Sequence, residues 1–184
     1  SLVANGPICA GQDAVFTITG TAGAQVSYML NTVSQNIVIP ASGIATIVVT
    51  GATTNQTIVM SQIQNTTTLC SAALTNTATV SVIALPTASI DAQSNAVCYN
   101  TSTGLTFTGT PNATVTFTNG TSTYTVTLNA SGTANYPTPN LTVDTTYSIT
   151  SVSTGTTPSC SQVVTDSETI SITPTPTIAS VSYT

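Results

Sequence analysis

The sequence has no lysine, arginine or histidine among its 184 residues, and only five residues are acidic. Nucleic-acid binding depends mainly on Lys and Arg, which neutralise phosphates and release counterions. We therefore expect no nucleic-acid partner and no attraction to anionic lipid. No apolar run approaches the roughly 20 residues of a membrane-spanning helix, so direct membrane insertion is not expected either.

Residues 1–9 contain neither a basic stretch nor an apolar stretch of the kind found in signal peptides. We therefore expect either that a signal has been removed or that the sequence is an internal segment.

The missing residue types also limit catalysis, because general acid–base and nucleophilic chemistry usually draws on His, Lys, Arg or paired carboxylates. Asp166 and Glu168, two residues apart, are the best carboxylate pair and could in principle serve glycoside hydrolysis. A glycosidase also needs a sugar cleft, normally lined with Trp, and the chain has no Trp. The sequence predicts that the protein is not an enzyme.

Apolar residues alternate with Thr and Ser at a period of two. Ala14, Phe16 and Ile18 mark one such segment, and Tyr124 and Val126 mark another. Turn residues separate these segments at intervals of about 10 residues, which is typical of a β-sandwich. The mean hydropathy of +0.33 comes from scattered Ala, Val and Ile rather than from blocks. We predict an all-β protein of two tandem Ig-like antiparallel β-sandwich domains, with about seven strands and one disulfide each.

The sequence repeats itself. TGTAGAQVSY at residues 19–28 returns as TGTPNATVTF at residues 108–117, a shift of 89 that also carries Cys9 onto Cys98. After one inserted residue the shift is 90, which carries Cys70 onto Cys160. Together with the Pro-Thr junctions near Pro86 and Pro176, this predicts one domain over 1–85 and a second over 86–175. Residues 176–184 would begin a third repeat or a linker. Such short, proline-containing junctions favour a stiff array.

The four cysteines form two equivalent pairs, Cys9 with Cys70 and Cys98 with Cys160, whose members lie 61 and 62 residues apart. Recurrence in register predicts one disulfide within each domain, and closing a loop of that length stabilises a domain by about 4 kcal/mol. No His and no C-x-x-C sequence suggests a metal or redox role instead. Disulfides predict an oxidising, extracellular location.

The sequence offers candidates for two further kinds of site. Calcium could be held by Asp91, Asp166 and Glu168, although the first repeat has Asn76 and Ala78 where the second has Asp166 and Glu168. We therefore expect no cofactor, with calcium as the one alternative. Candidate N-glycosylation sequons begin at Asn55, Asn65, Asn100, Asn112, Asn119, Asn129 and Asn140. The T-x-T runs at 114–118 and 123–127 could form a flat threonine face, but Thr is also an ordinary exposed strand residue.

Several motifs together suggest a family: C-x(10)-G-T-x-x-A-x-V-x-aromatic, then A-S-G, T-Y-S-I-T-S-V, S-C-S and T-I-S-I. This pattern resembles the Ig-like or PKD-like tandem repeats of giant Bacteroidetes cell-surface adhesins, of the gliding-motility type exported by the type IX system. The resemblance implies surface display in long filaments and adhesion rather than catalysis. It also implies that Thr145, after Asp144, is a candidate O-glycosylation site.

The leading hypothesis is a structural or adhesive repeat segment of a large cell-surface protein, acting as a stiff spacer and display stalk. Its partners would be neighbouring repeats, subunits of the same type, or surfaces and glycans. The alternative is a carbohydrate-binding or accessory module of a secreted protein. That alternative requires an aromatic or polar cluster in one repeat that its sister lacks.

Overall fold

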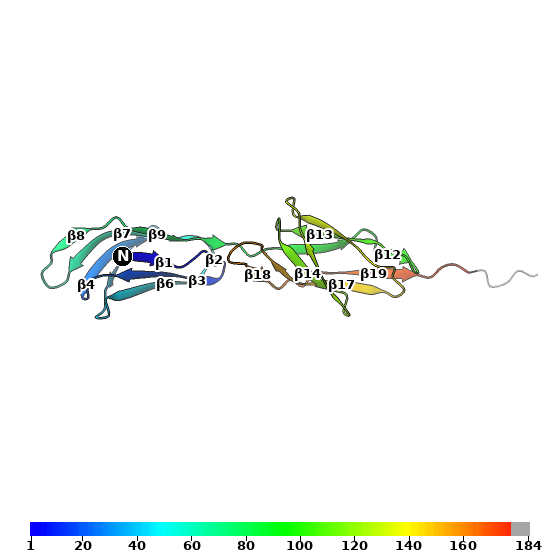
Figure 1. Ribbon diagram of the computed structural model, residues 1–184, viewed down its shortest axis with the longest axis horizontal. Coiled ribbons are helices and arrows are strands. Elements are labelled where there is room, and N and C mark those ends of the chain that lie inside the picture. Colours follow the sequence, from blue (N-terminus) through cyan, green and yellow to red (C-terminus); the bar gives the residue numbers. More distant parts are fainter. Residues whose placement is uncertain (178–184) are drawn as a thin grey trace, which may run out of the picture. The chain divides into compact units, whose positions relative to one another are not determined.

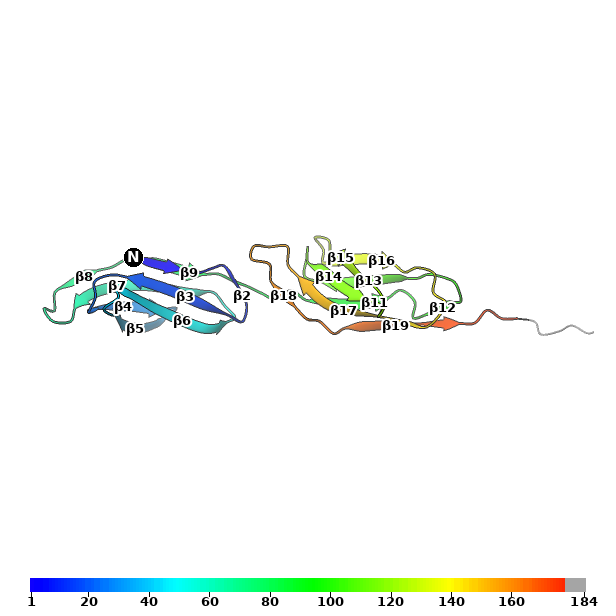
Figure 2. The same cartoon turned by 60° about the horizontal axis from the view of Figure 1, so that its bottom comes forward.

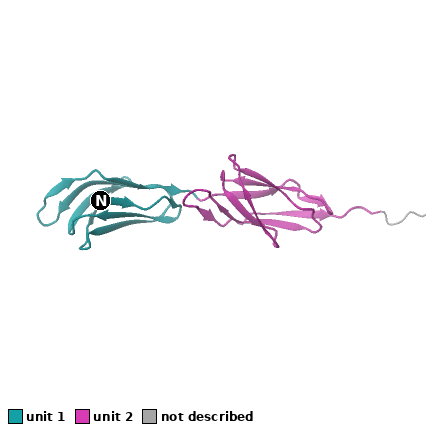
Figure 3. Cartoon of the chain, in the orientation of Figure 1, with its two compact units in different colours: residues 1–84 teal, residues 85–184 magenta. Residues whose placement is uncertain are grey.

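The computed structural model describes residues 1–177, which form strands, turns and bends without a helix. The chain divides into two compact units, Ser1–Ala84 (unit 1) and Leu85–Thr184 (unit 2), coloured separately in Figure 3. Among the described residues, no helix is long and apolar enough to cross a membrane. Most of the predicted third repeat, residues 178–184, lies outside the described part.

Unit 1 is a sandwich of two main sheets (Figure 1). One sheet has the order β1-β3-β6, and the other has the order β5-β4-β7-β8 with β9 also pairing with β7. The short strands β2 and β10 add a parallel pair. The ten strands are β1 (Leu2–Ala4), β2 (Ile8–Cys9), β3 (Gln12–Thr19), β4 (Ala24–Leu30), β5 (Val33–Val38), β6 (Ile44–Ala52), β7 (Gln56–Asn65), β8 (Ser71–Ala73), β9 (Thr77–Val80) and β10 (Val82–Ile83).

Unit 2 repeats this arrangement (Figure 2). Its sheets have the orders β11-β13-β16 and β12-β19-β17-β14-β15, and β18 pairs with β17. Here β12 runs parallel to β19, as β2 does to β10. The nine strands are β11 (Ala88–Ala92), β12 (Ala96–Cys98), β13 (Gly104–Gly109), β14 (Thr114–Thr118), β15 (Thr123–Thr127), β16 (Thr133–Pro137), β17 (Thr145–Ser153), β18 (Ser161–Gln162) and β19 (Ser167–Thr173).

The predicted count of about seven strands differs from the observed ten and nine for two reasons. The first strand of each unit is split in two, as is the last strand of unit 1, and each unit has an additional short strand, β8 or β18. In unit 1 the first strand is split into β1 and β2, which join different sheets, and Ser81 separates β9 from β10. The predicted alternation is confirmed in β3, where Ala14, Phe16 and Ile18 are buried in the core. The all-β, Ig-like sandwich class is therefore correct.

The same irregularity recurs in both units. The register between β4 and β7 shifts at Ser27/Tyr28, and that between β14 and β17 shifts at Thr116/Phe117, an equivalent position. A β-bulge of this kind inserts one unpaired residue and bends the strand. The inserted residue is Ser61 in unit 1 and Thr150 in unit 2. Each hydroxyl donates a hydrogen bond across the bulge, to the carbonyl of Ser27 or Thr116, at 3.1 Å.

Candidate functional site

The carboxylates considered for calcium or catalysis serve different parts of unit 2. Asp166 accepts a hydrogen bond from the Ile90 amide at 2.9 Å and so connects β11 to the residue that precedes β19. Glu168 pairs with buried Tyr147 between β19 and β17, whereas Asp91 is exposed next to buried Ile90. Glu168 therefore lies on the core-facing side of its strand and Asp91 on the outward side of another. Within residues 1–177, no three His, Cys, Asp or Glu side chains form a group that could hold a metal.

Asp144 has a structural role that the sequence comparison did not reveal. Its Oδ1 accepts a hydrogen bond from the Ile172 amide at 2.7 Å. In unit 1, Oδ1 of the equivalent Asn55 accepts a bond from the Val82 amide at 2.8 Å. The two side chains differ in charge but supply the same acceptor to the same strand, so the change from Asn to Asp preserves the framework.

Thr145, the candidate O-glycosylation site, begins β17 and is half-buried. Its hydroxyl donates a hydrogen bond to the Val143 carbonyl at 2.9 Å. Glycosylation of Thr145 stays a prediction.

Several asparagines of the sequons build turns. Oδ1 of Asn65 accepts bonds from the Thr67 and Thr68 amides, both at 2.9 Å. Asn119 and Asn129 accept similar local bonds. Asn100 and Asn112 adopt the left-handed backbone conformation that asparagine tolerates better than most residues. Turn formation accounts for asparagine at these five positions, and glycosylation at each sequon stays a prediction.

The cysteines require a correction. Cys70 and Cys98 are free and exposed, whereas Cys9 and Cys160 are disulfide-bonded. The predicted pairs Cys9–Cys70 and Cys98–Cys160, and with them one disulfide within each domain, are therefore wrong.

The physical reason is the direction of one long strand in unit 1. Cys9 pairs with Ile83. Ile83 follows shortly after Val80, which pairs with Gln56 at the start of β7, so Cys9 lies near the start of β7. Cys70 lies at the other end of β7, where its carbonyl accepts a bond from the Asn65 amide at 2.9 Å. The ten residues of β7 span roughly 30 Å, whereas a disulfide requires Cα atoms about 4.4–6.8 Å apart.

Unit 2 separates its cysteines in the same way. Cys98 pairs with Thr173 near the start of β17, and Cys160 follows the end of β17, where its carbonyl accepts a bond from the Thr154 amide at 2.8 Å. Figure 1 shows the corresponding strands, β2 and β8 in unit 1 and β12 and β18 in unit 2, at opposite ends of their own sandwiches. Repeat spacing revealed that the cysteines correspond, but not which end of a strand each one occupies.

An aromatic cluster distinguishes unit 2. The Phe117 ring lies 4.7 Å from Phe107, 5.4 Å from Tyr124, 5.1 Å from Tyr136 and 6.4 Å from Tyr147, measured between ring centroids. Tyr124 and Tyr136 are half-buried and lie 5.4 Å apart. They come from β15 and β16, the last strands of the two sheets.

The hydroxyl of Tyr147 is the cluster's unusual group. Tyr147 is fully buried, and its hydroxyl has no hydrogen-bond partner. Burial raises the pKa of Tyr147, and the nearby Tyr124 and Tyr136 raise it further. A buried hydroxyl without a partner is costly in free energy, which makes this group a point where a ligand or water could bind.

Unit 1 lacks this cluster. At the equivalent positions stand Ile18, Tyr28, Gln35, Ile47 and Ile58. The Tyr28 hydroxyl donates a hydrogen bond at 2.9 Å to the Gln35 side chain, which occupies the position of Tyr124. Aligning the repeats position by position would have revealed the cluster, because four aliphatic or amide residues of unit 1 are replaced by aromatic residues in unit 2.

Unit 2 has two further tyrosines. Tyr99, which follows β12, is 53% exposed. Tyr183 lies outside the described residues.

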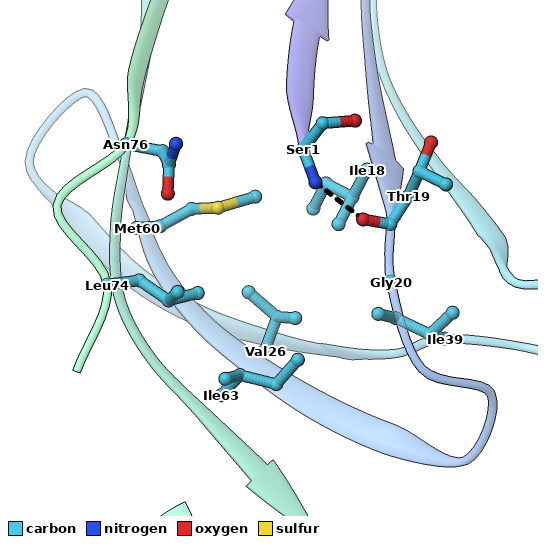
Figure 4. A pocket seen from close by; sticks show the side chains of 10 residues that line it. All are labelled: Ser1, Ile18, Thr19, Gly20, Val26, Ile39, Met60, Ile63, Leu74 and Asn76. Atoms are coloured by element: carbon cyan, nitrogen blue, oxygen red, sulfur yellow. Dashed lines mark hydrogen bonds between the residues drawn. The ribbon is translucent and has the colours of Figure 1, made fainter. Parts of the chain in front are cut away.

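Unit 1 contains a small cavity of about 70 Å³ (Figure 4). The Ser1 amino group lies at its rim and donates a hydrogen bond to the Thr19 carbonyl at 2.6 Å. Ligand sites usually have volumes of about 300–1,000 Å³, so this cavity is too small for a sugar. Its lining is mostly apolar and consists of Ser1, Ile18, Thr19, Gly20, Val26, Ile39, Met60, Ile63, Leu74 and Asn76.

Comparisons with known proteins give solved structures only. No family model matches the sequence, and no curated protein matches it. One similar structure is a calcium-stabilised adhesin with which an Antarctic bacterium reaches out and binds ice, at 15% identity and a TM-score of 0.48. A second is a 1.5-MDa bacterial ice-binding adhesin, at 16% identity and a TM-score of 0.45. A third consists of fibronectin(III)-like modules of Clostridium thermocellum CbhA, at 15% identity and a TM-score of 0.39.

The matches cover 95%, 93% and 95% of this chain. The chain spans 49% and 63% of the two adhesin chains and 95% of the third. At these TM-scores the likenesses decide nothing about function.

Proposed function

We propose that this chain is a segment of extracellular structural or adhesive repeats that acts as a spacer and display stalk within a larger surface protein. The repeated framework is the observation that supports this proposal. Both units carry the same bulge, and the same acceptor bond from Asn55 or Asp144 to the last strand. Selection for a common framework, with surface residues free to vary, is what a spacer requires.

Hydroxyl pairs add to the shared framework. Thr57 and Thr79 hydroxyls lie 2.9 Å apart in unit 1, and the equivalent Thr146 and Thr169 hydroxyls lie 2.8 Å apart in unit 2. Such cross-strand Thr pairs stabilise a sheet without any charged residue. One such pair therefore contributes to the stability of the equivalent sheet in each unit.

The finer proposal concerns the family. The motifs that resemble Bacteroidetes gliding-type adhesins, with the disulfide chemistry of an oxidising compartment, favour export to the cell surface. Neighbouring repeats and glycan-bearing surfaces are the partners that such a stalk would meet.

The spacer function can be tested by changing the number of copies. One or two additional copies of residues 1–179 would be placed between a surface anchor and a fluorescent reporter. We expect the reporter's height above the surface, measured by super-resolution microscopy, to rise by an equal step for each copy. A height that does not respond to copy number would overturn the proposal.

A second candidate function rests on the aromatic cluster. Tyr124 and Tyr136 are half-buried neighbours with polar hydroxyls, and the sister unit has Gln35 and Ile47 instead. Tyrosine rings can pack on sugar faces while their hydroxyls form hydrogen bonds. A carbohydrate-binding role for unit 2 therefore remains the alternative.

Glycan arrays would distinguish this alternative from a pure spacer. If unit 2 binds sugar, saturable binding should disappear in Tyr124→Ala and persist in the control Gln35→Ala, which changes the equivalent position of unit 1. Binding that is absent, or lost equally in both variants, would exclude this site.

A further inference from the structure

The bonded and free cysteines follow a pattern in the repeat. Cys9 and Cys98 are equivalent, as are Cys70 and Cys160. One member of each equivalent pair is disulfide-bonded, and the other is free. The same position is fully buried at Cys160, where it is bonded, and exposed at Cys70, where it is free.

The two cysteines of each unit lie at defined ends of its sandwich. The first, Cys9 or Cys98, lies at the trailing end, where the chain leaves the unit. The Ala10 amide donates to the Ile83 carbonyl at 2.8 Å, and the equivalent Tyr99 amide donates to Thr173 at 3.1 Å. Ile83 and Thr173 are the final residues of the last strands.

The second cysteine lies at the leading end, where the chain enters the unit. In unit 2, Gln162 follows Cys160 by two residues and donates from Nε2 to the Pro86 carbonyl at 2.6 Å. In unit 1, Cys70 lines a hollow of about 270 Å³ with Thr21, next to Gly20 and the Thr19 carbonyl that binds the Ser1 amino group. In a tandem array, the trailing end of one copy is followed along the chain by the leading end of the next.

We propose that the free Cys98 forms a disulfide with the free Cys70 of a copy of this chain that follows it in a tandem array. Cys98 would then bond to a copy that follows it in the array, and Cys70 would bond to a copy that precedes it. The hollow beside Cys70 would then hold the trailing end of another copy of this repeat. This inference rests on the proposed tandem array.

The chemistry is oxidation of two thiols to one disulfide. The Cys98 thiolate attacks a small-molecule disulfide such as oxidised glutathione, forming a mixed disulfide and releasing one reduced thiol. The Cys70 thiolate of the other copy then attacks the Cys98 sulfur and releases the second small thiol. Each cysteine loses one proton, and the small-molecule disulfide accepts both electrons.

A tandem chain provides the test. Residues 1–179 would be joined directly to a second complete chain, so that Ser1 of the second chain takes the repeat position of Ser180. Each separate chain has two free thiols, at Cys70 and Cys98, so an unlinked tandem keeps four. After oxidation with oxidised glutathione, we expect two titratable thiols per tandem chain, because Cys98 of the first half bonds to Cys70 of the second.

Peptide mapping identifies the bond. The chain has no Lys or Arg for trypsin to cut after, so chymotrypsin would be used. The expected linked peptide joins the segments around Cys98 and Cys70. The variant with Cys98→Ser in the first half should keep three titratable thiols and lose this peptide.

Retention of four free thiols, or a linked peptide joining Cys70 to Cys70, would overturn the inference. The height experiment separates the two proposals. Equal height steps together with four free thiols would leave the spacer function intact and remove only the cross-link.

Discussion

Asn55 and Asp144 show how one hydrogen-bond acceptor can be kept while its charge changes. Each side chain accepts a bond from an amide of its unit's last strand, Val82 or Ile172. The negative charge of Asp144 is therefore not needed for this bond. At this position a neutral amide therefore supplies the same hydrogen-bond acceptor as a carboxylate.

Replacing Asp144 tests this interpretation. We expect Asp144→Asn to change the free energy of unfolding of unit 2 very little, because Asn55 already serves in unit 1. Asp144→Ala should cost about 1 kcal/mol, since the Ile172 amide loses its acceptor. Urea unfolding of the full chain measures both changes, and equal losses in the two variants would show that charge is what matters.

Tyr147 carries a hydroxyl that contributes no hydrogen bond within the described residues. Tyr147→Phe should therefore leave the stability of unit 2 unchanged or raise it by about 1 kcal/mol, because an unsatisfied buried hydroxyl is removed. The control Tyr28→Phe breaks the bond to Gln35 and should lower the stability of unit 1 by about 1 kcal/mol. A loss of stability in Tyr147→Phe would reveal a bound water or ligand on this hydroxyl.

Alkaline pH should destabilise unit 2 through the same residue. The pKa of Tyr147 is raised in the folded state, chiefly by burial, so folding favours the protonated hydroxyl. Its stabilising contribution is complete below the ordinary tyrosine pKa of about 10 and is lost as pH rises toward the folded pKa. Thermal unfolding between pH 8 and 11 should show this loss, and Tyr147→Phe should reduce it.

Among the structural elements, the turn of the recurring Ala-Ser-Gly motif depends on its glycine. Gly43 and Gly132 have φ angles of 77° and 76°, in the left-handed region that favours glycine. Each carbonyl accepts a bond from a second glycine, Gly20 or Gly109, at 3.0 and 2.9 Å. The motif is therefore a closed turn between strands, and its recurrence reflects backbone geometry.

Alanine at the two glycines should have unequal effects. A Cβ at Gly43 would lie 3.4 Å from the Gly20 carbonyl oxygen, whereas a Cβ at Gly132 would clash with the Gly109 carbonyl oxygen. We expect Gly43→Ala to cost about 1 kcal/mol from backbone strain. Gly132→Ala should cost more, and thermal unfolding compares the two variants. Equal losses would contradict the clash.

The strands were readable from the sequence because one sheet face is buried and the period is two. Ala14, Phe16 and Ile18 follow that rule directly. The disulfide pairing could not be predicted from the sequence. The spacing between Cys9 and Cys70 does not show that β7 separates them at opposite ends of the unit. The Tyr124–Tyr136 contact was missed for a related reason: it joins the edge strands of two sheets, which alternation within one strand does not reveal.

For the whole molecule, the free thiols mean that each repeat can be cross-linked to another copy. A domain with its own internal disulfide would have no free thiol. Here Cys70 and Cys98 leave each unit with one free thiol that can form a disulfide with another copy. Disulfides between copies would stabilise a tandem array, because each cross-link restricts the chain entropy of the unfolded state.

Differential alkylation of the purified chain tests whether each unit contains its own internal disulfide. Free thiols would be blocked with one reagent, and the disulfides then reduced and labelled with another before chymotryptic mass spectrometry. The prediction is that Cys70 and Cys98 take the first label and that Cys9 and Cys160 take only the second. A linked peptide joining Cys9 to Cys70, or Cys98 to Cys160, would contradict it.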